Sequence, residues 1–118
     1  MSTKFLSNTI ITLLATCLFS GIVFAKEEHT SAALEHTTAA AAAAAATDAA
    51  SVRAHATEAL KHTGPAKVAH KPHPDVVKHI EEGEHHLKAA VDTAAKGDAA
   101  GAAHHAMEAK THLEAADK

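Results

Sequence analysis

The chain contains an internal repeat with a period of 50 residues, and this repeat restricts the fold more than any other feature of the sequence. A shift by 50 residues superimposes four histidines on four others, together with one aspartate and one glutamate. The histidine pairs are His29 with His79, His36 with His86, His55 with His105, and His62 with His112. Matching alanines arise by chance in a chain so rich in alanine, but matching histidines and acids rarely do. The sequence therefore indicates two copies of one structural unit.

Each copy is predicted to be a helical hairpin. Alanine is the best helix former, and residues 39–46 are an unbroken run of eight alanines. In the second copy, Gly97 suits the end of one helix and Asp98 suits the N-cap of the next, while Thr47 and Asp48 occupy the same places in the first copy. We expect helices over residues 27–46, 49–63, 75–96 and 99–116.

The two hairpins are predicted to pack as an all-α, up-down-up-down four-helix bundle. The segment 64–74 contains three prolines, and proline ends or kinks a helix, so we assign these residues to a linker. The hairpins then cover residues 26–63 and 75–118. Apolar or small residues spaced alternately by four and three predict the buried seam of the second hairpin. They are Val76, Ile80, Gly83, Leu87, Ala90 and Ala94, followed by Ala99, Ala102, Ala106, Ala109, Leu113 and Ala116.

Residues 1–25 have the layout of a secretory signal peptide. Lys4 precedes an apolar run over residues 5–25, which ends in the small-residue cleavage site Val23-Phe24-Ala25. We expect cleavage after residue 25 and a periplasmic protein with no membrane association. Two alternatives are lipidation at Cys17 and retention of the apolar run as a membrane helix, which needs about 20 residues.

The composition of residues 26–118 excludes several classes of function. This part contains all 12 histidines, no Cys, Trp, Tyr or Phe, and 10 Lys and Arg against 14 Asp and Glu, a formal charge of −4. Thiolate metal sites and thiol catalysis are excluded because there is no cysteine. A nucleic-acid partner is not expected, since there is neither a basic excess nor an aromatic side chain to stack on a base. No catalytic motif is present, and we do not expect an enzyme.

The repeated histidines have a spacing that suits metal binding between helices. Two histidines seven residues apart share one face of a helix but are separated by about 10.5 Å along its axis, too far to bind one ion together. Three of the four helices place a glutamate between them, within reach of either histidine. These motifs are His55-x-x-Glu58-x-x-x-His62, His79-x-x-Glu82-x-x-x-His86 and His105-x-x-Glu108-x-x-x-His112; the first helix has Ala32 at the glutamate position.

An antiparallel hairpin brings the histidines of its two helices together, because they are spaced symmetrically about each turn. We therefore expect four pairs: His29 with His62, His36 with His55, His79 with His112, and His86 with His105. Imidazole and carboxylate ligands suit Cu(II), Ni(II), Zn(II) and Co(II), with Cu(II) bound most tightly. The candidate ligands are His29, His36, His55, Glu58, His62, His79, Glu82, His85, His86, His104, His105, Glu108 and His112. His70 and His73 in the linker are candidates for weaker sites.

The sequence resembles the small metal-binding proteins of the SmbP type, most closely in the stretches from His79 to His86 and from His105 to His112. The resemblance extends over residues 26–118. It implies an exported, cysteine-free four-helix bundle that binds several divalent metal ions reversibly, copper foremost, and serves metal buffering or tolerance. We expect a monomer whose partners are metal ions; the delivery partner stays open.

A second function remains possible on the residues alone. Twelve histidines titrate around pH 6.5, so the charge of residues 26–118 would change from −4 towards +8 in acid. The chain would then be a pH-responsive helical interaction protein that needs no metal.

Overall fold

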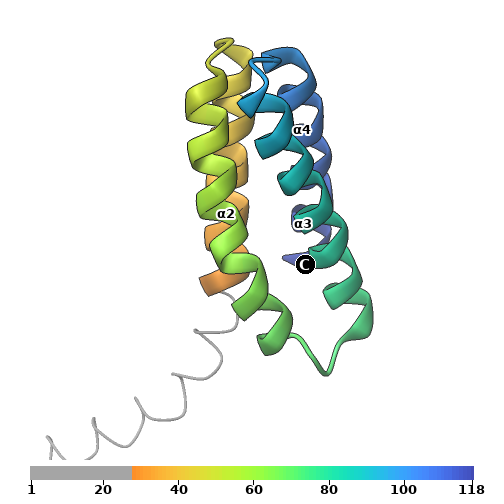
Figure 1. Ribbon diagram of the computed structural model, residues 1–118. Coiled ribbons are helices and arrows are strands. Elements are labelled where there is room, and N and C mark those ends of the chain that lie inside the picture. Colours follow the sequence, from red (N-terminus) through yellow and green to blue (C-terminus); the bar gives the residue numbers. More distant parts are fainter. Residues whose placement is uncertain (1–27) are drawn as a thin grey trace, which may run out of the picture.

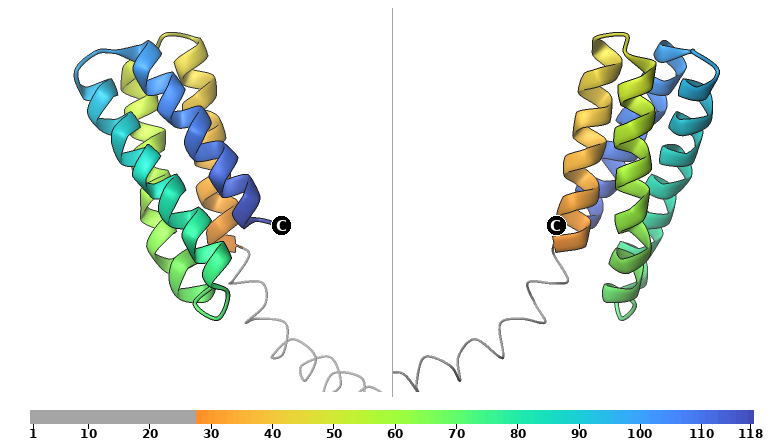
Figure 2. Two further views of the ribbon diagram at one scale, coloured as in Figure 1. Left: turned by 90° about the vertical axis from the view of Figure 1, so that its right-hand side faces the viewer. Right: turned by 60° about the vertical axis from the view of Figure 1, so that its left-hand side comes forward.

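The computed structural model describes residues 28–118, and this part of the chain forms four helices and no strand (Figure 1). The first helix covers residues 28–45, followed by α2 (Ala49–Ala69), α3 (Pro74–Ala95) and α4 (Ala99–Ala116). Successive helices run in opposite directions and pack side by side, as the views of Figure 2 also show. The predicted up-down-up-down bundle of two hairpins is confirmed. The predicted signal peptide, with Cys17, lies outside the described residues.

The two hairpin turns have the same backbone geometry. Thr47 and Gly97 both have positive φ angles, 58° and 80°. Their amides and those of the following aspartates donate to carbonyls in the last turn of the preceding helix, at 2.9 and 3.1 Å in the first hairpin and 2.9 and 3.2 Å in the second. Asp48 and Asp98 then cap the next helix by accepting a hydrogen bond from the amide three residues further on, at 3.1 and 2.8 Å.

The core of the bundle is the seam that the heptad spacing predicts, and it is made mainly of alanine. In α3 and α4 the predicted seam residues are buried, except that Val76 and Ala99 are half-buried at its ends. The first helix and α2 contribute the repeat-equivalent positions. These are Thr30, Ala33, Thr37, Ala40 and Ala44, with Val52, Ala56, Ala59, Thr63 and Ala66 from α2.

The two halves of the seam differ in side-chain size. Three buried threonines of the first hairpin occupy the positions of the three largest buried side chains of the second: Thr30 for Ile80, Thr37 for Leu87, and Thr63 for Leu113. The hydroxyls of Thr37 and Thr63 donate to carbonyls of their own helices, which satisfies them inside the core.

Gly83 lies where α3 and α4 approach each other closely. A Cβ atom on this residue would lie 3.0 Å from Cγ of Leu113 and 3.1 Å from its Cδ2. The leucine therefore fills the space that the glycine leaves free. In the first hairpin the equivalent residues are Ala33 and Thr63, so a larger residue on one helix faces a smaller one on the other.

The linker is shorter than the prolines predict. α2 continues through Gly64 and Pro65 to Ala69, and only residues 70–73 connect it to α3. The prediction that the helix ends at residue 63 is wrong because tertiary packing outweighs the helix-breaking effect of the proline. Ala66 is buried against Ile80 and Ala116, and these contacts bury one face of the added turns.

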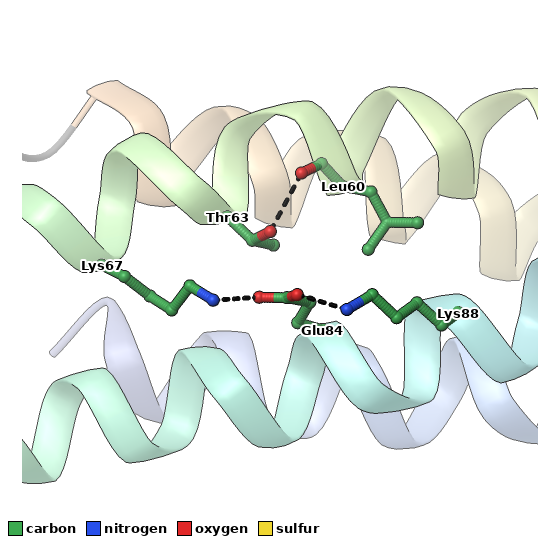
Figure 3. A network of polar contacts seen from close by, with 5 residues as sticks. All are labelled: Leu60, Thr63, Lys67, Glu84 and Lys88. Carbon is green, nitrogen blue, oxygen red and sulfur yellow. Dashed lines mark hydrogen bonds and ion pairs between the residues drawn. The ribbon is translucent and has the colours of Figure 1, made fainter.

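A charged network also holds the extension of α2 against α3 (Figure 3). The ammonium groups of Lys67 and Lys88 donate to the two carboxylate oxygens of Glu84, at 2.5 Å each. Partial burial raises the pKa of Glu84, but the hydrogen bonds from both lysines outweigh this effect, and its pKa lies below the usual value. Glu84 therefore stays ionised between the two helices.

Candidate metal centre

The eight repeated histidines lie beside the seam, where each hairpin leaves them half-buried. Each directly precedes a buried residue of the seam, so the packing of the seam fixes its helix face. The histidines of the first helix and α2 form one row, and those of α3 and α4 form another. We call these rows the first ladder (His29, His62, His36, His55) and the second ladder (His79, His112, His86, His105).

All four predicted histidine pairs are in contact. The ring centroids are 5.6 Å apart for His29 and His62 and 6.3 Å apart for His36 and His55. In the second hairpin the distances are 6.2 Å between His79 and His112, and 5.9 Å between His86 and His105. The Nδ1 atoms of His29 and His62 lie 3.3 Å apart.

The ladders also contain contacts that the sequence symmetry does not predict. His62 stacks on His36 with a centroid distance of 5.8 Å, and His112 stacks on His86 at 5.5 Å. Each of these α2 and α4 histidines thus lies between two histidines of the partner helix. The symmetry of the sequence about each turn predicts the four pairs. The additional contacts arise because the two packed helices are staggered along their axes.

The first of two groups with metal-ligand geometry is formed by His79, Glu82 and His112, here called the open-end trio. Its three ligand atoms lie within 4.8 Å of one another. Oε2 of Glu82 is 3.0 Å from Nδ1 of His112 and 3.5 Å from Nδ1 of His79. The ligands of a tetrahedral zinc ion are about 3.3 Å apart, so small side-chain rotations would close this group around an ion.

The second group, the turn-side trio, consists of His86, Glu108 and His112, and its ligand atoms also lie within 4.8 Å of one another. His112 belongs to both trios, and because a neutral imidazole offers one free nitrogen, the two trios are alternative positions for an ion. Both groups join α3 to α4, so an ion in either would connect the two helices of the second hairpin. Three protein ligands leave a coordination position for water or an incoming ligand, as catalytic zinc sites also do.

His86 has the electrostatic environment of a neutral imidazole. Its pKa is lowered from the usual value by partial burial and by the neighbouring His112, His105 and His85, against the opposing effect of Glu108. Its Nδ1 atom is shielded from solvent and has no hydrogen-bond partner within the described chain. A neutral imidazole is the form that binds a metal ion.

The first hairpin has no comparable trio among residues 28–69. Ala32 occupies the position of Glu82, so the carboxylate of the open-end trio is missing. Glu58 occupies the position of Glu108, but Nζ of Lys61 donates to its Oε1 at 2.5 Å. This hydrogen bond lowers the pKa of Glu58. The carboxylate is thus already paired with a cation.

The remaining predicted ligands lie at the margins of the ladders. His55 and His105 contact only one ladder histidine each, at the turn end. His85 and His104 are exposed and meet the neighbouring rings of His86 and His105 edge-on. Nε2 of His104 is 4.0 Å from Glu108, on the outside of the hairpin.

The two linker histidines lie at the ends of α2 and α3. His70 is the C-cap of α2, and its Nε2 atom is 3.0 Å from the hydroxyl of the buried Thr30. His73 is the N-cap residue of α3 and makes no side-chain capping hydrogen bond. Neither residue belongs to a group of three metal-ligating side chains within the described chain.

The comparisons with known proteins agree with this chemistry. The sequence profile of the family described as small metal-binding protein matches residues 3–116, nearly the whole chain. No curated protein matches the chain. None of the described helices is long and apolar enough to cross a membrane. Since the match covers both hairpins, the chain belongs to the small metal-binding protein family.

Proposed function

We propose that the protein binds and sequesters several divalent transition-metal ions, Cu(II) foremost and also Ni(II), Zn(II) and Co(II). The observation that carries this proposal is the pair of His–Glu–His trios between α3 and α4. Imidazole nitrogens and carboxylate oxygens prefer these ions, and Cu(II) forms the tightest complexes in the divalent series. The described residues contain no thiolate to favour softer metals.

The geometry supports reversible storage better than permanent occupancy. The side chains of His79, Glu82 and His112 are 42%, 38% and 27% exposed, so the trio borders solvent. Nδ1 of His79 itself is shielded, and a rotation of its ring would present it to an ion. A partly exposed site with three protein ligands leaves a coordination position through which the ion can pass to another ligand. We therefore assign the protein a non-catalytic role in metal buffering, tolerance or transport.

The periplasm is the proposed location. This assignment rests on the signal-peptide pattern of residues 1–25. Fractionation of cells that produce the full chain, followed by mass determination of the purified protein, tests both export and cleavage after Ala25.

The test of function is isothermal titration of residues 26–118 with Cu(II) at pH 7.5 and pH 5. Protons compete with metal ions for imidazole, so several equivalents should bind at pH 7.5 and most should be lost at pH 5. A variant with His36, His55, His86 and His105 replaced by Gln serves as control and should bind fewer ions. Absence of saturable binding at either pH would overturn the proposal and favour a metal-independent pH response.

A further inference from the structure

We propose that the two hairpins are unequal metal sites, that the second hairpin fills first, and that His112 is the ligand common to its two strongest positions. This inference rests on the proposed function, and it concerns the order in which the protein takes up its ions. It is carried by two differences between residues that the 50-residue repeat makes equivalent, and by the position of His112 in both trios.

The first difference is the carboxylate of the open-end trio. Glu82 contacts both His79 and His112, whereas the first hairpin has Ala32 between the equivalent His29 and His62. The first hairpin therefore offers two imidazoles where the second offers two imidazoles and a carboxylate. The carboxylate adds a third ligand and a negative charge that partly neutralises a divalent ion.

The second difference is the availability of the remaining glutamate. Glu58 and Glu108 are equivalent, but Lys61 pairs with Glu58, and the residue equivalent to Lys61 is Thr111. Thr111 donates to a carbonyl of its own helix and adds no positive charge. A metal ion bound by His36, His62 and Glu58 would compete with the ammonium group of Lys61 for the carboxylate and would be repelled by it. Within residues 28–118 no lysine pairs with Glu108; its neighbour Nε2 of His104, at 4.0 Å, is itself a candidate ligand.

The third feature is the shared position of His112. Its ring lies between those of His79 and His86, with centroid distances of 6.2 and 5.5 Å, and it belongs to both trios. Loss of this one imidazole removes a ligand from both trios, whereas loss of His79 or His86 removes a ligand from one.

The first experiment compares His112→Gln with His62→Gln, its repeat-equivalent control, by Cu(II) titration at pH 7.5. His112→Gln should weaken binding of the first Cu(II) equivalent by about tenfold or more. Loss of an outer-shell partner alone weakens metal affinity by about tenfold or more, and loss of a direct ligand should weaken it at least as much. His62→Gln should weaken the first equivalent much less than His112→Gln does, and should affect later ones. Circular dichroism before each titration checks that both variants remain helical.

A second experiment introduces the carboxylate of the open-end trio into the first hairpin and removes the competing lysine. Ala32→Glu with Lys61→Thr, made in the His112→Gln background, should restore a strong first equivalent. The matched control is Ala32→Gln with Lys61→Thr, which supplies a similar side chain without the charge and should restore less.

A third measurement needs no substitution. Cu(II) broadens NMR signals of nearby nuclei, so half an equivalent added to the wild-type chain should remove signals around His79, His86 and His112 before those around His29, His36 and His62. Simultaneous broadening in both hairpins, or equal losses in the His62→Gln and His112→Gln variants, would overturn the inferred order. A wild-type chain that binds no Cu(II) would instead overturn the proposed function.

Discussion

At the scale of single residues, the two hairpin turns place a threonine and a glycine in the same backbone conformation. Thr47 and Gly97 have φ angles of 58° and 80° at equivalent positions, followed by equivalent capping aspartates. Glycine adopts this left-handed conformation without strain, whereas a β-branched residue is crowded by its own Cβ substituents. The first turn thus keeps the geometry of the second with a less suitable residue.

Replacing Thr47 with glycine should therefore stabilise the protein. Relief of the left-handed strain exceeds the extra conformational entropy that glycine adds to the unfolded chain, and we expect a gain of about 0.5–1 kcal/mol. Urea denaturation in the presence of chelator measures the difference. The reverse change, Gly97→Thr, is the control and should destabilise; a loss of stability in Thr47→Gly would show that the threonine side chain is needed in the turn.

His86 makes a residue-scale prediction about pH. Its pKa is lowered in the folded chain, so folding favours its neutral form. The stability linked to this group is present above the unfolded pKa of about 6.5 and is lost as the pH falls through the lower folded value. Without metal, the wild type should lose more stability between pH 7.5 and pH 5 than His86→Gln does. Urea denaturation at both pH values with chelator present tests this; equal losses would contradict it.

At the scale of elements, α2 shows how tertiary contacts extend a helix beyond its sequence signals. Gly64 and Pro65 are both exposed inside the helix, which continues because Ala66 is buried and Lys67 pairs with Glu84. Pro65 has no amide hydrogen to donate to the carbonyl of Lys61, so the helix lacks one internal hydrogen bond there.

Replacing Pro65 with alanine should stabilise α2. Alanine restores the amide donor and is about 3 kcal/mol more favourable than proline in a helix interior, although the more flexible unfolded chain offsets about 1 kcal/mol of this. We expect a net gain of about 1–2 kcal/mol in the free energy of unfolding, measured by urea denaturation. Pro72→Ala, outside the helices, is the control and should have little effect; an unchanged or reduced stability of Pro65→Ala would mean that α2 ends before this residue in solution.

The predictable elements are those in which local chemistry and periodicity agree. The seam of α3 follows from the spacing of Ile80, Gly83 and Leu87, and the second turn follows from Gly97 before Asp98. The end of α2 was not predictable, because the contacts of Ala66 and Lys67 join residues of different helices. A local rule for proline contains no information about such contacts.

The same distinction applies to the candidate centre. The histidine pairs follow from spacing alone, since a turn relates the two helices symmetrically. The stagger that puts His112 between His79 and His86 depends on the packing of α3 against α4, and the pairing of Lys61 with Glu58 depends on side-chain rotamers. The sequence therefore predicts which residues gather, but the structure determines which of them form a trio.

At the scale of the whole molecule, metal binding and folding should be coupled. The core contains few large side chains, and each trio joins α3 to α4, so an ion bound to the folded chain opposes separation of the second hairpin. A ligand at a free concentration one hundred times its dissociation constant stabilises the folded state by about 2.7 kcal/mol per site.

Zn(II) should consequently raise the unfolding temperature of the protein, and chelator should reverse the effect. Thermal unfolding followed by circular dichroism measures both. The His112→Gln variant, which removes a ligand from both trios, should show a smaller increase at the same Zn(II) concentration. An increase of the same size in this variant would place the stabilising ions outside the two trios.

The close approach at Gly83 gives the core an influence on the metal centre. Gly83 directly follows Glu82, and Leu113 directly follows His112, so two ligands from different helices are separated by the thickness of one glycine–leucine contact. A methyl group at position 83 would lie 3.0 Å from Cγ of Leu113, so the leucine side chain, and with it the spacing of the helices, would have to adjust. A core residue that never contacts an ion can therefore change the distance between two of its candidate ligands.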